Sequence, residues 1–270
     1  MKVCTYFNEL VVDPVLRVWL PTLRRHYAGD VVLFFAGDCD LTRAKGARVQ
    51  TVDTRPLATA DDQFGGIVRA WARYTSALPA GEPVLIFDAA DVMFQAGLDP
   101  LAAEVAGSDK LRCMVEPRGL GGSPSMLRTL TEVLPAELCG KYLPELLDRR
   151  LLNTSLLAAR AEVLTACFQE CVDTLVDGCK GNWIAAQAWL NLYALLHPGT
   201  VEPLHPRWCF DLRWFKYTVS PREQYVSHDD GALIPVVHAA GHQTTKTLFG
   251  AFRGMRKEYN SLAQKARRAQ

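Results

Sequence analysis

The chain has 270 residues, of which 49% are hydrophobic and 22% charged, and its formal net charge is +1. A chain of this length and composition can bury a sizeable core, which excludes a disordered chain. No apolar run reaches the roughly 18–20 residues that a membrane-spanning helix needs, and the N-terminal residues lack the apolar segment of a signal peptide. We therefore predict a cytoplasmic protein whose eight cysteines are reduced thiols.

Strand-like and helix-like segments alternate along the first half of the chain. Continuous apolar runs predict buried strands, and apolar residues three and four apart predict helices. The predicted elements are a strand at 2–7, a helix at 13–27, strands at 30–37 and 47–53, a helix at 65–78, and strands at 83–88 and 110–117. This order predicts an α/β fold, with a mainly parallel sheet between helices. The Gly/Ser/Pro-rich residues 118–126 predict a loop.

Two carboxylates follow one of these strands directly. In PVLIFDAADVMFQ, residues 83–95, Asp88 ends an apolar run and Asp91 lies three residues later. Ligands of open parallel sheets bind outside the carboxyl ends of the strands, and oxygen ligands suit Mn²⁺ or Mg²⁺. The simpler interpretation is that the two acids only cap a turn.

A histidine ends a second short apolar run near the C-terminus. His238 follows Val236 and Val237, and Gly241 and Lys246 come after it. A lone histidine at a strand end is more often structural, but the glycine permits close backbone approach and the lysine can neutralise phosphate. With Asp88 and Asp91, this group predicts a site for a cation and a diphosphate.

Three segments together resemble a known family. VLIFDAADVMF (84–94) resembles the metal-binding Asp motif of GT-A-fold glycosyltransferases, in the variant of the glycosyltransferase domain of procollagen lysyl hydroxylases. VVHAAGHQTTK (236–246) resembles that family's late His-x-x-Gly…Lys motif, and LLNTSLLAARAEVL (151–164) is similar to its Asn-Ser-Gly segment beside the sugar pocket.

This resemblance implies a fold and a reaction. The fold is a single GT-A (Rossmann-like) domain over residues 1–250, with a mainly parallel mixed sheet flanked by helices. The implied reaction is a transfer of a sugar from a nucleotide-sugar, a UDP-sugar in that family, with Mn²⁺ or Mg²⁺ and with retention of configuration. The implied metal ligands are Asp88, Asp91 and His238.

The resemblance also assigns donor and acceptor residues. Thr5, Tyr6 and Arg69 are implied at the nucleotide, together with Asp88, Gly241 and Lys246, and Asn153 and Gln187 are implied on the catalytic side. The chain departs from the family at two places, first beside the sugar pocket and then on the acceptor side. Thr154 and Ser155 replace the family's Ser-Gly, and Ala185 and Ala186 precede Gln187 where the family has two acids.

The C-terminal tail is strongly basic. From Lys246 onward, seven basic residues face one acid, which gives the tail a formal charge of +6 and leaves −5 for the rest of the chain. Residues 251–270 are expected to form a basic helical tail, either a solvated helix or an arm that contacts an anionic partner. With the missing acids, this charge suggests a polyanionic acceptor such as modified DNA, while a glycan, peptide or small molecule remains an alternative.

Two further groups have a simpler interpretation as core. Cys167, Cys171 and Cys179 with His197 could bind zinc, but their irregular spacing favours buried thiols. The aromatic residues of 207–217 are expected mostly in the core, with ring stacking on a ligand as the alternative.

Two other functions remain open besides glycosyl transfer. The same acids could serve a metal-dependent nucleotidyltransferase or phosphohydrolase acting on nucleotides without a sugar. The chain could also be a catalytically silent sugar-nucleotide-binding protein, because Ala185 and Ala186 stand in place of acids.

Overall fold

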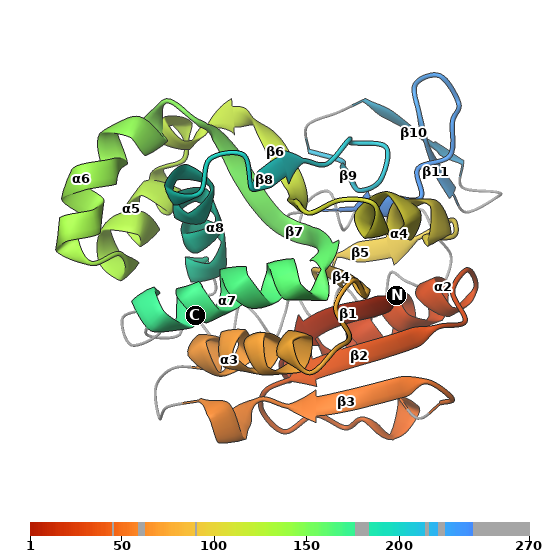
Figure 1. The fold of residues 1–270 in the computed structure, drawn as a ribbon. Coiled ribbons are helices and arrows are strands. Elements are labelled where there is room, and N and C mark those ends of the chain that lie inside the picture. Colours follow the sequence, from red (N-terminus) through yellow and green to blue (C-terminus); the bar gives the residue numbers. More distant parts are fainter. Residues whose placement is uncertain are drawn as a thin grey trace.

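A seven-stranded mixed sheet runs through the computed structural model of the chain, with strand order β3-β2-β1-β4-β7-β6-β8 (Figure 1). The structure describes residues 1–44, 46–58, 63–89, 91–175, 184–213, 216–220 and 225–239. The strands of this sheet are β1 (Lys2–Phe7), β2 (Asp30–Phe35), β3 (Val49–Asp53), β4 (Pro83–Phe87), β6 (Leu111–Gly119), β7 (Arg150–Arg160) and β8 (Val201–Pro203).

Most neighbouring strands of the sheet are parallel. β2 is parallel to β3 and to β1, and β1 is parallel to β4. β8 is parallel to β6. β7 is antiparallel to both of its neighbours, β4 and β6. The predicted mainly parallel mixed sheet is therefore confirmed, and the carboxyl ends of β1, β2 and β4 lie at one edge.

Helices cover both faces of the sheet, because alternate strand residues point to opposite faces. In β2, Val32 and Phe34 belong to a core that includes residues of α3, α7 and α8, while Val31 and Leu33 belong to a core that includes residues of α2 and α4. The α-helices are α1 (Val12–Pro14), α2 (Leu20–Arg24), α3 (Gln63–Ser76), α4 (Asp99–Ala106), α5 (Pro124–Val133), α6 (Ala136–Leu147), α7 (Ala161–Leu175) and α8 (Ala185–Leu196). None of the described helices is long and apolar enough to cross a membrane.

The helix predicted over residues 13–27 is interrupted. The chain forms α1, then a π-helical segment over Val15–Trp19, and then α2. Pro21 has no N–H for the carbonyl four residues earlier, and the Thr22 hydroxyl donates to the carbonyls of Val18 at 2.7 Å and Trp19 at 3.1 Å. Both features draw the backbone away from regular α-helical bonding.

The loop predicted over residues 118–126 is wrong. β6 continues to Gly119, a 3₁₀ turn covers Leu120–Gly122, and α5 begins at Pro124. Proline suits the first turn of a helix, since the N–H that it lacks would have no partner there.

A second, three-stranded sheet lies beside the first. Its order is β5 (Val92–Phe94), β12 (Val236–His238) and β9 (Phe210–Asp211), with β12 antiparallel to β5 and parallel to β9. The Gln95 amide links this sheet to the hairpin of β10 (Tyr217–Ser220) and β11 (Tyr225–His228). Its Nε2 donates to the carbonyls of Val226 at 2.8 Å and Ile234 at 2.6 Å, and its Oε1 accepts from Val226 N at 2.7 Å.

Helix α3 packs so closely on the turn after β3 that Gly66 has no room for a side chain. A Cβ there would lie 2.9 Å from the Thr54 carbonyl oxygen and 2.9 Å from the Ala58 Cβ. Such contacts force the backbone to move, so we expect Gly66→Ala to lower the free energy of unfolding by about 1–3 kcal/mol in urea denaturation.

Gly140→Ala is the matched control for this prediction. Gly140 lies in α6, and a Cβ there would meet no atom within 4 Å. Alanine in a helix interior is favoured over glycine by about 0.5–1 kcal/mol, so we expect this variant to be slightly stabilised. Equal effects of the two substitutions would contradict the close packing at Gly66.

Candidate functional site

Asp88 and Asp91 lie where the chain passes from the large sheet to the small one. Asp88 directly follows β4, and Asp91 directly precedes β5. The position of Asp88 is fixed by its backbone N–H, which donates to the Ser155 carbonyl of β7 at 3.0 Å. The two acids therefore adjoin different sheets, although only two residues separate them.

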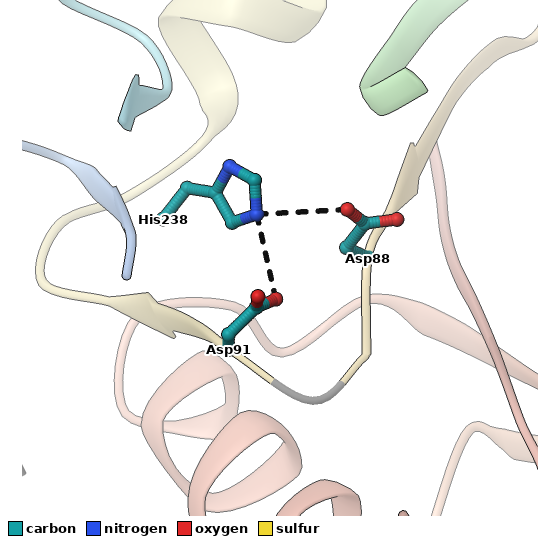
Figure 2. Close-up of side chains that lie close together, drawn as sticks. All are labelled: Asp88, Asp91 and His238. Carbon is teal, nitrogen blue, oxygen red and sulfur yellow. Dashed lines mark ion pairs between the residues drawn. The ribbon is translucent and has the colours of Figure 1, made fainter. Parts of the chain in front are cut away.

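His238 comes to these acids through strand pairing. β12 is antiparallel to β5, with His238 opposite Val92, and Ala239 N donates to the Asp91 carbonyl at 2.8 Å. The imidazole Nε2 lies 3.4 Å from Asp91 Oδ1 and 3.6 Å from Asp88 Oδ2. Dashed lines in Figure 2 mark these two ion pairs. One ligand atom from each of the three residues lies within 4.8 Å of the other two, so the group can hold a metal ion.

The three groups differ in exposure. The side chain of Asp88 is 47% exposed, that of Asp91 25% and that of His238 4%. Partial loss of hydration raises the pKa of Asp88 to about 6, the Asp91 carboxylate adds to this rise, and His238 opposes it. The exposed surface of Asp88 nevertheless leaves its carboxylate open to a ligand.

His238 and Asp91 stabilise each other's charge. Burial alone lowers the pKa of His238, but the charges of Asp91, Asp88 and Asp211 and a hydrogen bond to Asp91 raise it to about 9. Burial opposes ionisation of Asp91 as well, yet the charge and hydrogen bond of His238 hold the pKa of Asp91 below its usual value. The cluster therefore attracts positive charge strongly.

Further charged side chains surround this cluster. Asp211 Oδ2 lies 3.8 Å from His238 Nδ1, and Arg213 binds both oxygens of Asp211, with Nη2 2.6 Å from Oδ2. Arg213 Nη2 also lies 3.7 Å from Glu116 Oε1, and Arg118 Nε donates to Glu116 Oε2 at 2.6 Å. The side chains of Asp211 and Glu116 are 6% and 4% exposed.

These contacts provide a test of whether a cation fits. The described residues joined by these ion pairs include two guanidinium groups and four carboxylates: Arg118, Arg213, Asp88, Asp91, Asp211 and Glu116. With His238 neutral, the net charge is −2, which a divalent cation balances. Two oxygen ligands and one nitrogen ligand suit Mn²⁺, so the residues present fit such an ion.

The residues predicted at the nucleotide lie at or near the same sheet edge, in different settings. Thr5 is fully buried, and its hydroxyl donates to the Phe87 carbonyl at 2.8 Å, so it fixes β4 just before Asp88. Tyr6 is half-buried at the end of β1, and burial, with the charges of Glu9 and Cys39, raises its pKa to about 12. Arg69 donates to the Leu57 carbonyl at 3.1 Å and so ties α3 to the turn after β3.

Asn153 lies at an irregularity in β7. The register of β6 and β7 shifts between the pairs Cys113–Leu157 and Met114–Asn153. Asn153 Oδ1 accepts from Ser155 N at 2.7 Å, and Asn153 Nδ2 donates to Glu116 Oε1 at 2.8 Å. The side chain of Asn153 thus holds Glu116 and the irregular strand together.

Gln187 lies in the first turn of α8 and is half-buried. Its carbonyl accepts from Asn191 Nδ2 at 2.7 Å. The Asn191 amide also bonds both backbone groups of Leu152, at 3.0 Å each, and Leu152 precedes Asn153 in β7. Helix α8 is therefore fixed to the strand that carries Asn153.

Gly241, Lys246 and the basic tail lie outside the described residues. The roles given to them stay predictions. So do the functional roles of the other predicted site residues, since the geometry shows where they lie and not what they bind.

Sequence reasoning missed Glu116, Asp211 and Arg213. Glu116 follows the apolar residues Cys113–Val115 much as Asp88 follows β4, and this strand-end pattern could have identified it. The side chain of Arg213 pairs with Asp211 two residues before it, but the sequence offers no signal that this pair faces His238.

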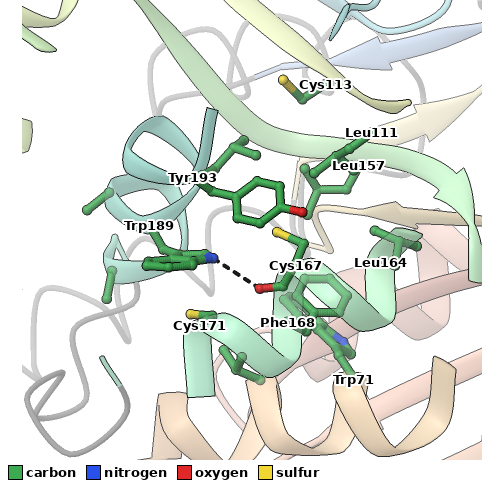
Figure 3. Close-up of a cluster of buried hydrophobic side chains, with 14 of the residues drawn as sticks. Trp71, Leu111, Cys113, Leu157, Leu164, Cys167, Phe168, Cys171, Trp189 and Tyr193 are labelled. Carbon is green, nitrogen blue, oxygen red and sulfur yellow. Dashed lines mark hydrogen bonds between the residues drawn. The ribbon is translucent and has the colours of Figure 1, made fainter. Parts of the chain in front are cut away.

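The described members of the predicted thiol cluster lie in the core. Cys167 and Cys171 of α7 pack with Trp71, Phe168 and Trp189, and Trp189 Nε1 donates to the Cys167 carbonyl at 3.1 Å (Figure 3). Burial raises the pKa of Cys167 to about 12. The seven cysteines that the structure describes are free thiols, as predicted; Cys179 lies outside the described residues. His197 bonds Glu170, with 2.8 Å between Nε2 and Oε2.

Comparison with solved structures gives many matches, and two of them cover nearly the whole chain. A crystal structure of the galactosyltransferase LgtC with donor and acceptor sugar analogues matches at a TM-score of 0.54 and 14% identity, covering 98% of this chain and 96% of the other. A Gln→Glu active-site mutant of LgtC matches at a TM-score of 0.56 and 12% identity, with the same coverage.

The chain has the GT-A fold. No protein-family model and no curated protein sequence matches it. At 12–14% identity, the structural likeness establishes the fold and leaves the reaction to be argued from the site.

Glu116 provides a test of the charged surroundings of the site. Replacing it by glutamine leaves Arg118 and Arg213 without one of their carboxylate partners, so we expect Glu116→Gln to lower the free energy of unfolding by about 1–3 kcal/mol. Urea denaturation measures this loss.

Glu104→Gln is the matched control. Glu104 also pairs with two arginines, Arg112 and Arg207, but its side chain is 35% exposed. Water can therefore solvate the arginines when the ion pairs are lost, and we expect a smaller decrease in the free energy of unfolding. A loss at Glu104 as large as at Glu116 would contradict the importance of burial at Glu116.

Proposed function

We propose that the chain is a metal-dependent glycosyltransferase that takes a sugar from a nucleotide-sugar, specifically a UDP-sugar. The carrying observation is the convergence of Asp88, Asp91 and His238 within 4.8 Å at the sheet edge of a GT-A fold. A galactosyltransferase with this fold has been crystallised with donor and acceptor sugar analogues, which supports the proposed substrate class.

The three residues suit the chemistry of a sugar–diphosphate bond. When this bond breaks, the nucleoside diphosphate leaves with additional negative charge. A bound Mn²⁺ or Mg²⁺ supplies electrostatic stabilisation of that charge. Asp88 and Asp91 would hold the ion by carboxylate oxygens and His238 by Nε2, while Lys246 is proposed to contact the diphosphate.

The finer resemblance to procollagen lysyl hydroxylases rests on motifs alone. It supports a retained anomeric configuration and the donor-side roles of Tyr6, Arg69 and Gly241. For Thr5 and Asn153 the geometry favours indirect roles, because Thr5 is fully buried and Asn153 bonds Glu116 and Ser155. We propose that Thr5 fixes β4 and that Asn153 orients Glu116 beside the sugar, with Gln187 on the acceptor side.

Release of nucleoside diphosphate tests this function directly. A panel of UDP- and GDP-sugars is incubated with the protein, with and without Mn²⁺, and free UDP or GDP is measured. We expect release from at least one UDP-sugar only with Mn²⁺, and a loss of about 100-fold or more in Asp91→Asn and His238→Gln, since an ion of this kind contributes several kcal/mol.

Asp109→Asn is the control for charge removal away from the site, because the Asp109 side chain is 72% exposed and pairs only loosely with Lys110, at 3.6 Å. Cleavage of nucleotides that carry no donor sugar on the diphosphate would show a phosphohydrolase or nucleotidyltransferase instead. Tight Mn²⁺-dependent UDP binding without any release would show a silent sugar-nucleotide-binding protein.

For the acceptor, we propose a polyanion such as modified DNA, because the segment from Lys246 onward carries a formal charge of +6. Binding that neutralises phosphates falls steeply with salt. We expect fluorescence anisotropy to show duplex DNA binding that weakens by about tenfold or more between 50 and 200 mM salt. No binding at low salt would direct the search to neutral glycans, peptides or small molecules.

A further inference from the structure

His238 has a second ring nitrogen that the proposed cation site does not use. Nδ1 is buried and has no hydrogen-bond partner among the described residues. A buried polar atom without a partner costs free energy, so such an atom calls for an explanation. The atom that faces it is Asp211 Oδ2, at 3.8 Å.

Strand pairing fixes Asp211 beside the ring. β12 and β9 are parallel, with His238 in register with Asp211, and Leu212 N donates to the His238 carbonyl at 3.1 Å. The side chain of Asp211 is 6% exposed, so little water competes for it.

Arg213 holds the Asp211 carboxylate in one orientation. Its Nε lies 3.0 Å from Oδ1 and 3.1 Å from Oδ2, its Nη2 lies 2.6 Å from Oδ2, and its backbone N donates to Oδ1 at 2.9 Å. A carboxylate held by a guanidinium keeps lone pairs for a further donor. Oδ2 can therefore accept a proton from the imidazole as well.

We propose that Asp211 is a positioning residue for His238: its carboxylate accepts the Nδ1 proton and thereby keeps Nε2 free to bind a divalent cation. This inference rests on the proposed metal-dependent function. Nδ1 and Asp211 Oδ2 are 3.8 Å apart, so the proposed hydrogen bond requires this separation to shorten. A carboxylate in this position fixes both the ring orientation and the position of the imidazole proton.

A simple charge effect makes a different prediction. If Asp211 acts only through its negative charge, Asp211→Asn weakens cation binding, Arg213→Gln strengthens it, and the double variant Asp211→Asn/Arg213→Gln, which changes no net charge, restores it. If Asp211 acts through the Nδ1 hydrogen bond, the double variant stays weak.

Mn²⁺ binding without any nucleotide separates these two cases. Free Mn²⁺ is followed by electron paramagnetic resonance during titration of the wild type and the three variants, and thermal unfolding shows that each variant is folded. We expect Asp211→Asn and the double variant to bind Mn²⁺ about 10–100-fold more weakly than the wild type, and Arg213→Gln to bind it at least as tightly.

Asp53→Asn is the matched control. Arg55 binds Asp53 from two residues later in the same way, with Nε 3.0 Å from both oxygens and Nη2 2.7 Å from Oδ2. The described contacts of Asp53 include no histidine, so we expect Asp53→Asn to bind Mn²⁺ with the affinity of the wild type. A drop equal to that of Asp211→Asn would overturn the inference.

The outcomes distinguish this inference from the proposed function. Wild-type affinity in the double variant overturns the role of Asp211 and leaves the metal-dependent transferase standing. Failure of the wild type to bind Mn²⁺ overturns both. If a variant does not fold, the ¹⁵N chemical shifts of the His238 imidazole are measured in the Zn²⁺-bound wild type and assigned by comparison with His238→Gln. We expect these shifts to show a protonated Nδ1. An unprotonated Nδ1 overturns the proposal.

Discussion

The antiparallel pairing of β5 with β12 is the contact on which the candidate site depends. β5 begins one residue after Asp91, and β12 ends at His238, so their register places the carboxylate beside the imidazole. Phe94, Met93, Val236 and Val237 are nearly fully buried in this pairing. Burial of these apolar side chains therefore stabilises an arrangement whose charged ends would not gather by themselves.

The charged groups at this junction balance one another incompletely. The carboxylates outnumber the guanidinium groups among the described side chains, and the raised pKa of His238 is one consequence. A proton on His238 Nε2 and a cation at the same atom satisfy the same excess of negative charge, so they compete. A ligand that binds only the folded chain also stabilises it, so a cation bound at this junction would raise the free energy of unfolding.

The remaining polar residues of the site serve mainly to hold its walls in place. Asn153 joins the irregular strand β7 to Glu116, and Asn191 joins α8 to the same strand. Buried polar networks of this kind are costly when one partner is removed, which makes them rigid. The likeness to LgtC at 12–14% identity shows that the fold tolerates extensive change in sequence, and one fold can therefore carry different sites.

The sequence by itself determined the order of the main strands and helices and the position of the strand-end acids. Apolar runs such as residues 84–87 are of strand length and favour a buried strand, and the periodicity of residues 65–78 favours a helix, so these elements follow from local pattern. Local pattern also identified Asp88, Asp91 and His238, because a polar residue that ends an apolar strand stands out. It did not show the π-helical segment at Val15–Trp19, since hydrogen-bond competition there leaves the apolar spacing intact.

Only the tertiary structure decided which charges meet. That Asp211 faces His238, and that Arg213 lies between Asp211 and Glu116, follows from the parallel pairing of two short strands and the packing of β6 beside them. The short apolar run of β12 is visible in the sequence, whereas β9, with two residues, carries almost no signal, and neither run indicates its partner strands. Their partners are selected by long-range burial and register, which a one-dimensional pattern does not contain.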